Sequence, residues 1–428
     1  MARENVDLYQ EQFTENQTRP VLERLRADFD AHNHDGSNSK YLENIIARTL
    51  QVNSAIIGGY RLFEATVGPT QSNYKSVAEA LLAGETRIFV RNGTYTAEPI
   101  WSISTASTTI IGESMNGVDI TFADDTTANN RNIYINATRV TVGNMKLTAF
   151  ATNSNDLFEF GASGSRPYLF SLILKNTNGA FFESSAITNF YATIRDVYLD
   201  MTTSLSAANM IGFNTVKNSL VENCFVDMTG LTSTYTGVKV ITGCVNVRFV
   251  GFTLYADQAS NIPSLDNSPT CAFVGSYFYL QEMTFAAHID SSFIENNVNA
   301  PAGYLVALNQ VGSRFTNNRV KTGAASDQLL QSSAANTIIT SNYFDGGSKI
   351  LLQHASVTIR GGIFSNNTWI ASYDGMDLNL GTNTLKWNAI GNTIRNNKGG
   401  GITIPTITDG GTTNNAAAAG AMNQLILG

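Results

Sequence analysis

Short runs of alternating apolar and polar residues return at a nearly fixed spacing in the second half of the chain. The recurring phrase reads Phe315-x-x-Asn318-x-Val320, Ile339-x-x-Asn342-x-Phe344, Phe364-x-x-Asn367-x-Trp369 and Ala389-x-x-Asn392-x-Ile394. The asparagines are 24, 25 and 25 residues apart (342−318, 367−342, 392−367). Alternation indicates half-buried strands, and a period of about 20 to 50 residues indicates stacked, equivalent units. We therefore expect an all-β solenoid, a parallel β-helix whose coils lie about 4.8 Å apart.

We expect the repeated asparagine to point into the solenoid at a bend. There its amide can bond backbone groups and the equivalent amides of neighbouring coils, while the apolar residues three before and two after it fill the core. The same ladder is predicted to continue upstream through the following candidate positions: Asn144, Leu172, Asp196, Asn223, Gly251, a coil near Phe273, and Asn296.

Residues 72–112 predict a distinct opening to the solenoid. Ser76 or Asn73 can cap a short helix over residues 77–82 that ends at Gly84. Strands are predicted at 86–90, from a turn at 92–95 to Ile103, and at 109–112. This order resembles the opening of the pectate-lyase-like superfamily, in which a short helix plugs the first coil. Over roughly residues 70–405, the resemblance implies a right-handed parallel β-helix.

Composition divides the chain into four segments. Residues 1–57 hold 15 of the 61 charged residues (27 + 34), about twice the density of the remainder. Apolar spacing predicts helices after Thr18 and from Lys40 onward, and we interpret 1–57 as an oligomerising and docking segment or, alternatively, a helical cap on the solenoid. A linker, capping helix and first coils follow at 58–112, then the β-helix body at 113–405 and a low-complexity tail at 406–428.

Between the two predicted helices lies the phrase His32-Asn-His34-Asp35-Gly36-Ser-Asn38-Ser. Its residues favour tight turns, so a structured loop is one interpretation. In a three-fold assembly, His32 and His34 of each chain could alternatively bind one axial metal. The phrase resembles one near the start of many phage fibre and appendage proteins, and that resemblance implies a virion protein.

One column of the predicted ladder carries candidate chemistry. Asp200 and Asp227 each lie four residues beyond a ladder position, so they are expected to be neighbours on adjacent coils. Their separation of about 5 Å would suit a retaining glycosidase. Tyr255 continues the column, and Tyr277 and Tyr279 lie nearby; these tyrosines are candidates for stacking on sugar rings. The alternative is that the acids are merely solvated on an outer face.

Charge and cysteine content exclude several classes of function. A formal net charge of −7 argues against nucleic acid as the main partner. The three cysteines, Cys224, Cys244 and Cys271, are too few for a disulfide framework and are expected to be small buried side chains. No signal peptide or membrane span is evident in the sequence. No nucleotide-binding motif is present either, and we expect no cofactor.

These observations favour a phage virion appendage, a homotrimer that joins other virion proteins through residues 1–57 and meets host surface glycan with the β-helix flank. Such a chain would be made in the host cytoplasm and leave the cell in the particle by lysis. The alternatives are a polysaccharide depolymerase, either glycosidase or lyase, and a structural virion protein without a ligand.

Overall fold

The computed structural model describes residues 56–57, 60–61, 63–70, 72–123, 131–149, 156–175, 180–184, 191–200, 209–213, 216–228, 236–240, 244–256, 270–280, 283–285, 288–290, 292–296, 304–308, 311–322, 328–333, 336–347, 349–352, 362–371, 377–379, 388–396, 406–408 and 424–427. The predicted helices within 1–57, and with them His32 and His34, lie outside these residues. Two compact units divide at residues 63 and 64. In the first, β1 (Ile56–Ile57) pairs antiparallel with β2 (Tyr60–Arg61).

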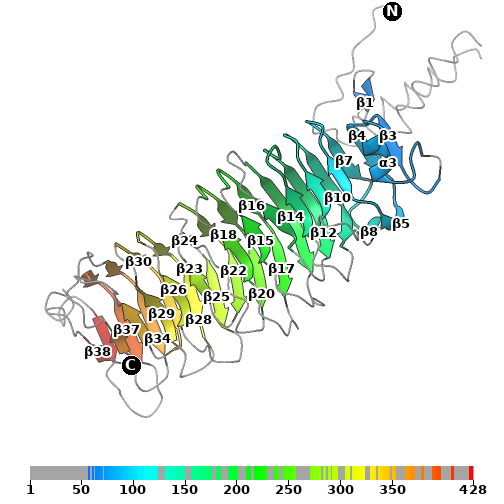
Figure 1. Ribbon diagram of the computed structural model, residues 1–428. Helices are drawn as coiled ribbons and strands as arrows, with labels where there is room; N and C mark the ends of the chain where they lie inside the picture. The colour runs from blue at the N-terminus through cyan, green and yellow to red at the C-terminus, as the bar shows by residue number, and fades with distance from the viewer. Residues whose placement is uncertain are drawn as a thin grey trace, which may run out of the picture. The chain divides into compact units, whose positions relative to one another are not determined.

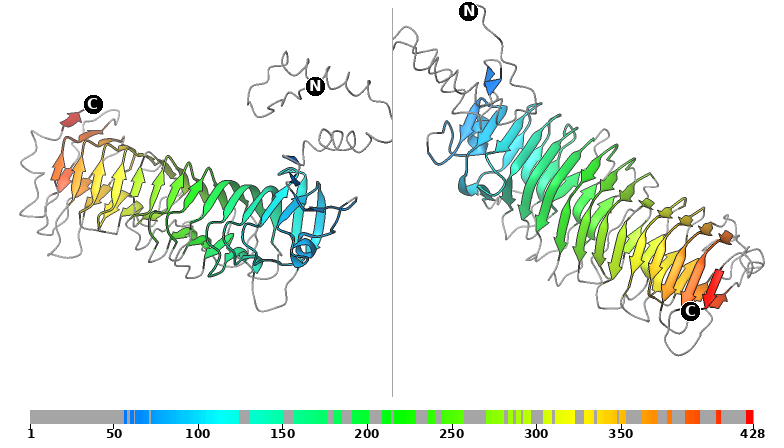
Figure 2. Two further views of the ribbon diagram at one scale, coloured as in Figure 1. Left: turned by 90° about the horizontal axis from the view of Figure 1, so that it is seen from above. Right: turned by 180° about the vertical axis from the view of Figure 1, so that it is seen from behind.

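The second unit is a parallel solenoid built from three ladders of strands, which we call faces one, two and three in the order in which the chain visits them (Figure 1). Within each sheet, strands pair in parallel with the equivalent strands of neighbouring coils, and Figure 2 shows the coils following one another in sequence order. The predicted all-β parallel solenoid is therefore confirmed.

Face one begins with β3, β4 and β7 and continues through the first part of the long strands β10, β12 and β14. Its strands are β3 (Ala65–Val67), β4 (Arg87–Val90), β7 (Thr109–Gly112), β10 (Thr141–Thr148), β12 (Tyr168–Lys175), β14 (Thr193–Asp200), β16 (Leu220–Glu222), β19 (Arg248–Val250), β21 (Ala272–Val274), β24 (His288–Asp290), β27 (Arg314–Thr316), β30 (Ile338–Thr340), β33 (Ile363–Ser365) and β36 (Asn388–Ile390).

Face two contains the second part of β10, β12 and β14. Its other strands are β5 (Gly93–Glu98), β8 (Val118–Phe122), β17 (Phe225–Met228), β20 (Thr253–Ala256), β22 (Tyr277–Leu280), β25 (Phe293–Asn296), β28 (Arg319–Lys321), β31 (Tyr343–Asp345), β34 (Thr368–Ala371), β37 (Thr393–Asn396) and β39 (Gln424–Leu427).

Face three consists of two six-stranded parallel sheets. The first contains β6 (Trp101–Ile103), β9 (Arg131–Ile135), β11 (Asp156–Phe160), β13 (Phe182–Ser184), β15 (Asn209–Phe213) and β18 (Thr236–Val240). The second contains β23 (Met283–Phe285), β26 (Tyr304–Leu308), β29 (Gln328–Ser332), β32 (Lys349–Leu352), β35 (Asp377–Asn379) and β38 (Thr406–Thr408).

The four repeated asparagines lie in a single buried file, as predicted. Asn318 donates its backbone N–H and its side-chain amide to Oδ1 of Asn342, at 2.9 and 3.1 Å. Asn342 bonds Asn367 in the same two ways, and Asn367 bonds Asn392. Each amide also donates to a backbone carbonyl. The ladder therefore satisfies buried polar groups in every coil that it crosses.

Upstream, the predicted ladder is wrong by one residue at most positions. Asn144, Asp196, Asn223 and Gly251 have positive φ angles of 50° to 62° and form the bend between faces one and two, not the buried file. The strand register places the following residues in that file: Met145, Leu172, Val197, Cys224, Phe252, Ser276 and Ser292. Leu172 alone was placed correctly, and Asn296 lies four residues beyond the file. Asparagine suits both a left-handed bend and a buried ladder, and this explains the slip.

The predicted helix at the start of the solenoid is confirmed as α3 (Val77–Leu82). Ser76 caps it by accepting the N–H of Glu79, and Gly84 follows with a φ of 85°. Val77 and Ala80 join the apolar core of the first coils. The helix therefore covers apolar side chains that the first coil would otherwise expose.

Candidate functional site

The predicted column of acids and tyrosines exists on the outward side of face two. Asp200 is the register partner of Asp227, Asp227 of Tyr255, and Tyr255 of Tyr279. Tyr277 lies two residues before Tyr279 on the same strand, with its side chain on the same side. The one-residue error in the predicted ladder did not affect this column, because the positions of Asp200, Asp227 and Tyr255 were all predicted by counting from the bend residues.

Aromatic rings form a continuous row alongside the acids. Tyr198 stacks on Phe225, with centroids 5.1 Å apart and planes at 13°. Phe225 stacks on Tyr255 at 5.4 Å and 28°. Tyr255 then meets Tyr277 at 5.6 Å and Tyr279 at 5.5 Å. We call the seven residues of this surface the aromatic strip: Tyr198, Asp200, Phe225, Asp227, Tyr255, Tyr277 and Tyr279.

Alternation along the strands explains the composition of the strip. In β14 and β17 the side chains of Leu199 and Val226 point into the core, so the residues on either side of them point outward. Tyr198 and Phe225 were not among the predicted site residues. They lie two positions before Asp200 and Asp227, and extending the column by one step of the alternation would have found them.

Each carboxylate of the aromatic strip has a polar interaction with a neighbouring side chain. Lys175 Nζ lies 3.1 Å from Asp200 Oδ2, and the hydroxyl of Tyr198 donates to Asp227 Oδ2 at 3.1 Å. Burial raises the pKa of Tyr198 to about 12, and the charge of Asp227 and its hydrogen bond add to this shift. The phenol therefore keeps its proton at neutral pH and remains a donor.

The strip is suited to binding hydroxyl-rich ligands. Phe225 is sandwiched between Tyr198 and Tyr255, so it orders the row, whereas Tyr198 is 36% exposed and the tyrosines and acids offer polar groups to solvent. The C–H groups of a sugar ring can pack against aromatic surface while its hydroxyls bond carboxylates. Because the row follows successive coils, similar groups recur at the strand spacing of about 4.8 Å.

Other chemistry is limited in the part of the chain that the structure describes. Groups of three or more His, Cys, Asp or Glu that could hold a metal are absent from those residues. Cys224, Cys244 and Cys271 are buried, as expected, and none of the three forms a disulfide. Burial raises the pKa of the Cys224 thiol to about 12. Within the same residues, no helix has the length and apolar character that a membrane span requires.

Comparison with known proteins finds distant structural likeness alone. No family model and no curated protein sequence matches the chain. A GH87 α-1,3-glucanase catalytic domain in complex with tetrasaccharides is 11% identical, with a TM-score of 0.46, over 84% of this chain and 70% of that one. Pectin methylesterase PemA from Erwinia chrysanthemi is 14% identical, with a TM-score of 0.30, over 67% and 82%.

The A-module of a mannuronan C-5 epimerase from Azotobacter vinelandii is also similar. It is 9% identical, with a TM-score of 0.37, over 78% of this chain and 92% of that one. Likenesses of this degree say nothing about the aromatic strip, so any function for it must be argued from its own residues.

Proposed function

We propose that this chain binds a polysaccharide along the aromatic strip of face two. The observation that carries the proposal is the outward row of rings from Tyr198 to Tyr279, flanked by Asp200 and Asp227. A contiguous, partly exposed aromatic surface with polar groups at its edge is typical of interaction sites. A polymer is favoured over a small ligand because the row extends over four successive coils.

The test is a glycan array of bacterial surface polysaccharides, followed by titration calorimetry with the polymer that binds. Tyr255→Ala removes the ring that contacts Phe225, Tyr277 and Tyr279, and we expect its affinity to fall at least tenfold. Failure of the wild-type protein to bind any glycan would contradict the proposal.

Tyr343→Ala is the matched control. Tyr343 belongs to the same outward column as Tyr277 but lies beyond the strip, on β31. It also packs beside a neighbour, with Arg319 Cζ 5.7 Å from its ring centroid. If both variants lost affinity equally, the loss would reflect the general stability of face two and not contact with the ligand.

Hydrolysis is the second candidate function, favoured by the pairing of Asp200 with Asp227 on adjacent strands. A retaining glycosidase needs one carboxyl group as acid and a second as nucleophile, about 5 Å away. Asp227 accepts a hydrogen bond from Tyr198, and Asp200 forms an ion pair with Lys175. Both contacts favour an ionised carboxylate, whereas a general acid must carry a proton to donate. We therefore propose binding as the primary function. If the wild-type protein released reducing ends from a polysaccharide, and both Asp200→Asn and Asp227→Asn abolished that release, hydrolysis would be established instead.

We also propose that the protein is a trimeric phage virion appendage whose segment 1–57 docks it to the particle. This proposal rests on the sequence phrase from His32 to Ser39 and on the charge density of 1–57. Light scattering of the purified chain tests the trimer. Deletion of 1–57 is expected to leave a β-rich protein that no longer joins the particle, and a truncated chain that still assembles would contradict the docking role.

A further inference from the structure

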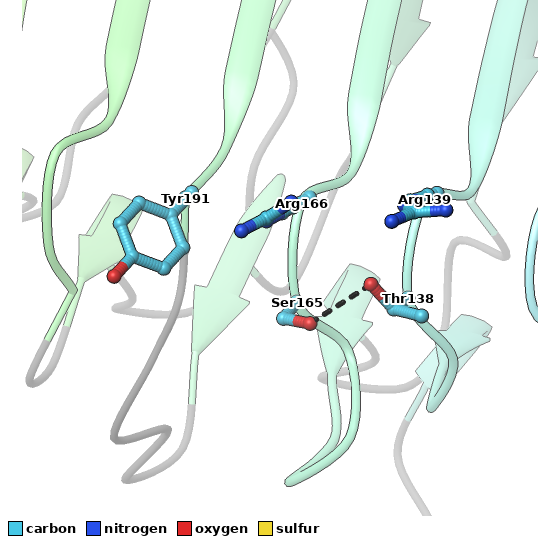
Figure 3. Close-up of a pocket in the computed structure, with 5 residues that line it drawn as sticks. All are labelled: Thr138, Arg139, Ser165, Arg166 and Tyr191. Carbon is cyan, nitrogen blue, oxygen red and sulfur yellow. Dashed lines mark hydrogen bonds between the residues drawn. The ribbon is translucent and has the colours of Figure 1, made fainter.

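A hollow with two arginines opens at the turn between faces three and one. It is lined by Thr138, Arg139, Ser165, Arg166 and Tyr191 and has a volume of about 410 Å³. Figure 3 shows Arg139, Arg166 and Tyr191 side by side on successive coils, with the two hydroxyl residues beside the arginines. None of these residues belongs to the aromatic strip.

Strand register fixes the spacing of the two arginines. Thr141 pairs with Tyr168, so Arg139 and Arg166, each two residues earlier, occupy equivalent positions on adjacent coils. Their backbones therefore lie about 4.8 Å apart. Tyr191 occupies the equivalent position on the next coil, and Arg166 Cζ lies 5.5 Å from the centroid of its ring.

Both arginines have a backbone conformation that arginine does not favour. Each has a φ of 59°, in the left-handed region preferred by glycine and asparagine. At the equivalent turn position, Asn218, Asn246, Gly312 and Asn336 also have positive φ, and so does Ser107, whereas Tyr191 and Thr270 do not. Two successive arginines therefore stand in a backbone conformation that glycine or asparagine adopts at lower cost, and strain of this kind directs attention to the function of their side chains.

The positive charge of the hollow is not balanced by acids of the described chain. In the described residues, ion pairs engage Arg87, Arg131, Lys146, Lys175, Arg195 and Arg319, but neither Arg139 nor Arg166. The two arginines carry like charges on adjacent coils, and an anion bound by both would offset their mutual repulsion. In a chain with a net charge of −7, this local excess of positive charge is distinctive.

Neighbouring groups add features suited to a sugar. Ser165 Oγ donates to Thr138 Oγ1 at 3.0 Å, and both of these hydroxyl residues line the hollow together with the arginines. The ring of Tyr191 borders the hollow. Two residues after Arg166, Tyr168 is 37% exposed and stacks on Phe170 at 5.1 Å.

From this arrangement we infer that the hollow binds the anionic group of an acidic sugar, either the carboxylate of a uronic acid or the ester of a sulfated sugar. The forked donors of Arg139 and Arg166 bind the anion, the ring of Tyr191 packs against the sugar, and the hydroxyls of Thr138 and Ser165 bond its polar groups. The inference rests on the proposed polysaccharide-binding function, and it identifies the polymer as acidic.

The test compares polymers that differ in charge. Titrations use polygalacturonate against its methyl ester, and dextran sulfate against dextran. We expect at least one charged polymer to bind, with an affinity that falls as salt is added, and its neutral counterpart to bind at least tenfold more weakly. The charged polymer that binds identifies carboxylate or sulfate as the group recognised.

The variant Arg139→Asn/Arg166→Asn removes both charges without harming the fold. Asparagine suits the left-handed turn and already stands at equivalent positions in other coils, so the urea midpoint should stay the same or rise. Binding of the charged polymer should fall at least tenfold. Arg314→Asn is the control, because Arg314 is an exposed arginine at the start of β27, several coils away.

Three outcomes would overturn the inference: no binding of either charged polymer, equal affinities for wild type and the double variant, or an equal loss in Arg314→Asn. Tyr255→Ala separates this result from the proposed function. If the arginine variant loses affinity while Tyr255→Ala keeps it, the hollow binds anionic sugar and the aromatic strip does not bind the polymer. The reverse result retains the strip and rejects the hollow.

Discussion

Asn342 donates both its backbone N–H and its side-chain amide to one oxygen, Oδ1 of Asn367, at 3.0 and 2.9 Å. The amide of Asn367 in turn donates to the carbonyl of Ile339 at 3.0 Å. Both asparagines are buried. Removing one side chain from this file therefore affects polar groups on the coils on either side of it.

Asn367→Ala should accordingly destabilise the solenoid by about 3 kcal/mol or more, because several buried donors and acceptors lose their partners. Urea unfolding followed by circular dichroism measures the effect. The control is Asn366→Gly, at the adjacent bend position, which is exposed and has a φ of 55°. Glycine adopts this conformation freely, so we expect a change within about 1 kcal/mol. Equal losses in the two variants would argue against the ladder as the cause.

Asp156 should make stability depend on pH. Burial raises the pKa of Asp156 to about 6, the charge of Glu159 adds to the rise, and the bond from the Ala180 N–H opposes it. The folded chain therefore holds this proton more tightly than the unfolded chain. The resulting stabilisation is present below pH about 4 and is lost as the pH rises through about 6.

Asp156→Asn removes this titration while keeping an oxygen that can accept from Ala180, at 2.9 Å in the wild type. Relative to the variant, the wild type should lose on the order of 3 kcal/mol of unfolding free energy between pH 4 and pH 7. Urea unfolding of both proteins at these two pH values measures the difference. A difference that does not change with pH would refute the prediction.

The buried carboxyl of Glu98 should be needed for its acceptor oxygen and not for its charge. Its Oε1 accepts the Ala78 N–H at 3.0 Å and the Trp101 indole N–H at 2.9 Å, and burial raises the pKa of Glu98. Glu98→Gln keeps that acceptor and should change stability by less than about 1 kcal/mol. Glu98→Leu should cost about 2 kcal/mol or more and weaken hydrogen-exchange protection in α3. Equal stability of the two variants would contradict this account.

The three cysteines should report on unfolding. Cys224, Cys244 and Cys271 are at most 3% exposed, and the thiolate is the reactive form of the group. We expect no reaction with Ellman's reagent in the native protein at pH 8 and three equivalents in urea. Cys224→Ala should reduce the denatured count to two. Rapid labelling of the native chain would show that the coil interior opens readily.

The repeat predicted the solenoid because stacking repeats the same environment in each coil, and Asn318 to Asn392 reveal that environment directly. Upstream, the equivalent file is filled by Met145, Leu172 and Val197, which any buried strand could carry, so the sequence there fixes the period but not the position within it. The bend residues attracted the assignment instead, because Asn144 and Asn223 look like ladder asparagines.

The residues of the aromatic strip could be predicted from the sequence only where they lie at the same number of residues after a bend. Asp200, Asp227 and Tyr255 were found because each lies four residues after a bend. Phe225 is an aromatic residue among many, and its place in the row depends on its neighbours across the strands. The hollow of Arg139 and Arg166 has no motif in the sequence, since the two arginines are 27 residues apart (166−139) and become neighbours only when the coils stack.

The left-handed bend between faces one and two is a feature of individual coils, since Asn144, Asp196, Asn223 and Gly251 each form the bend of their own coil. A tandem duplication or deletion of one whole coil would therefore leave all the others in register. A single inserted residue inside a strand would instead exchange the inner and outer side chains beyond it. Over evolutionary time, this architecture permits the length of the solenoid to change in steps of one coil.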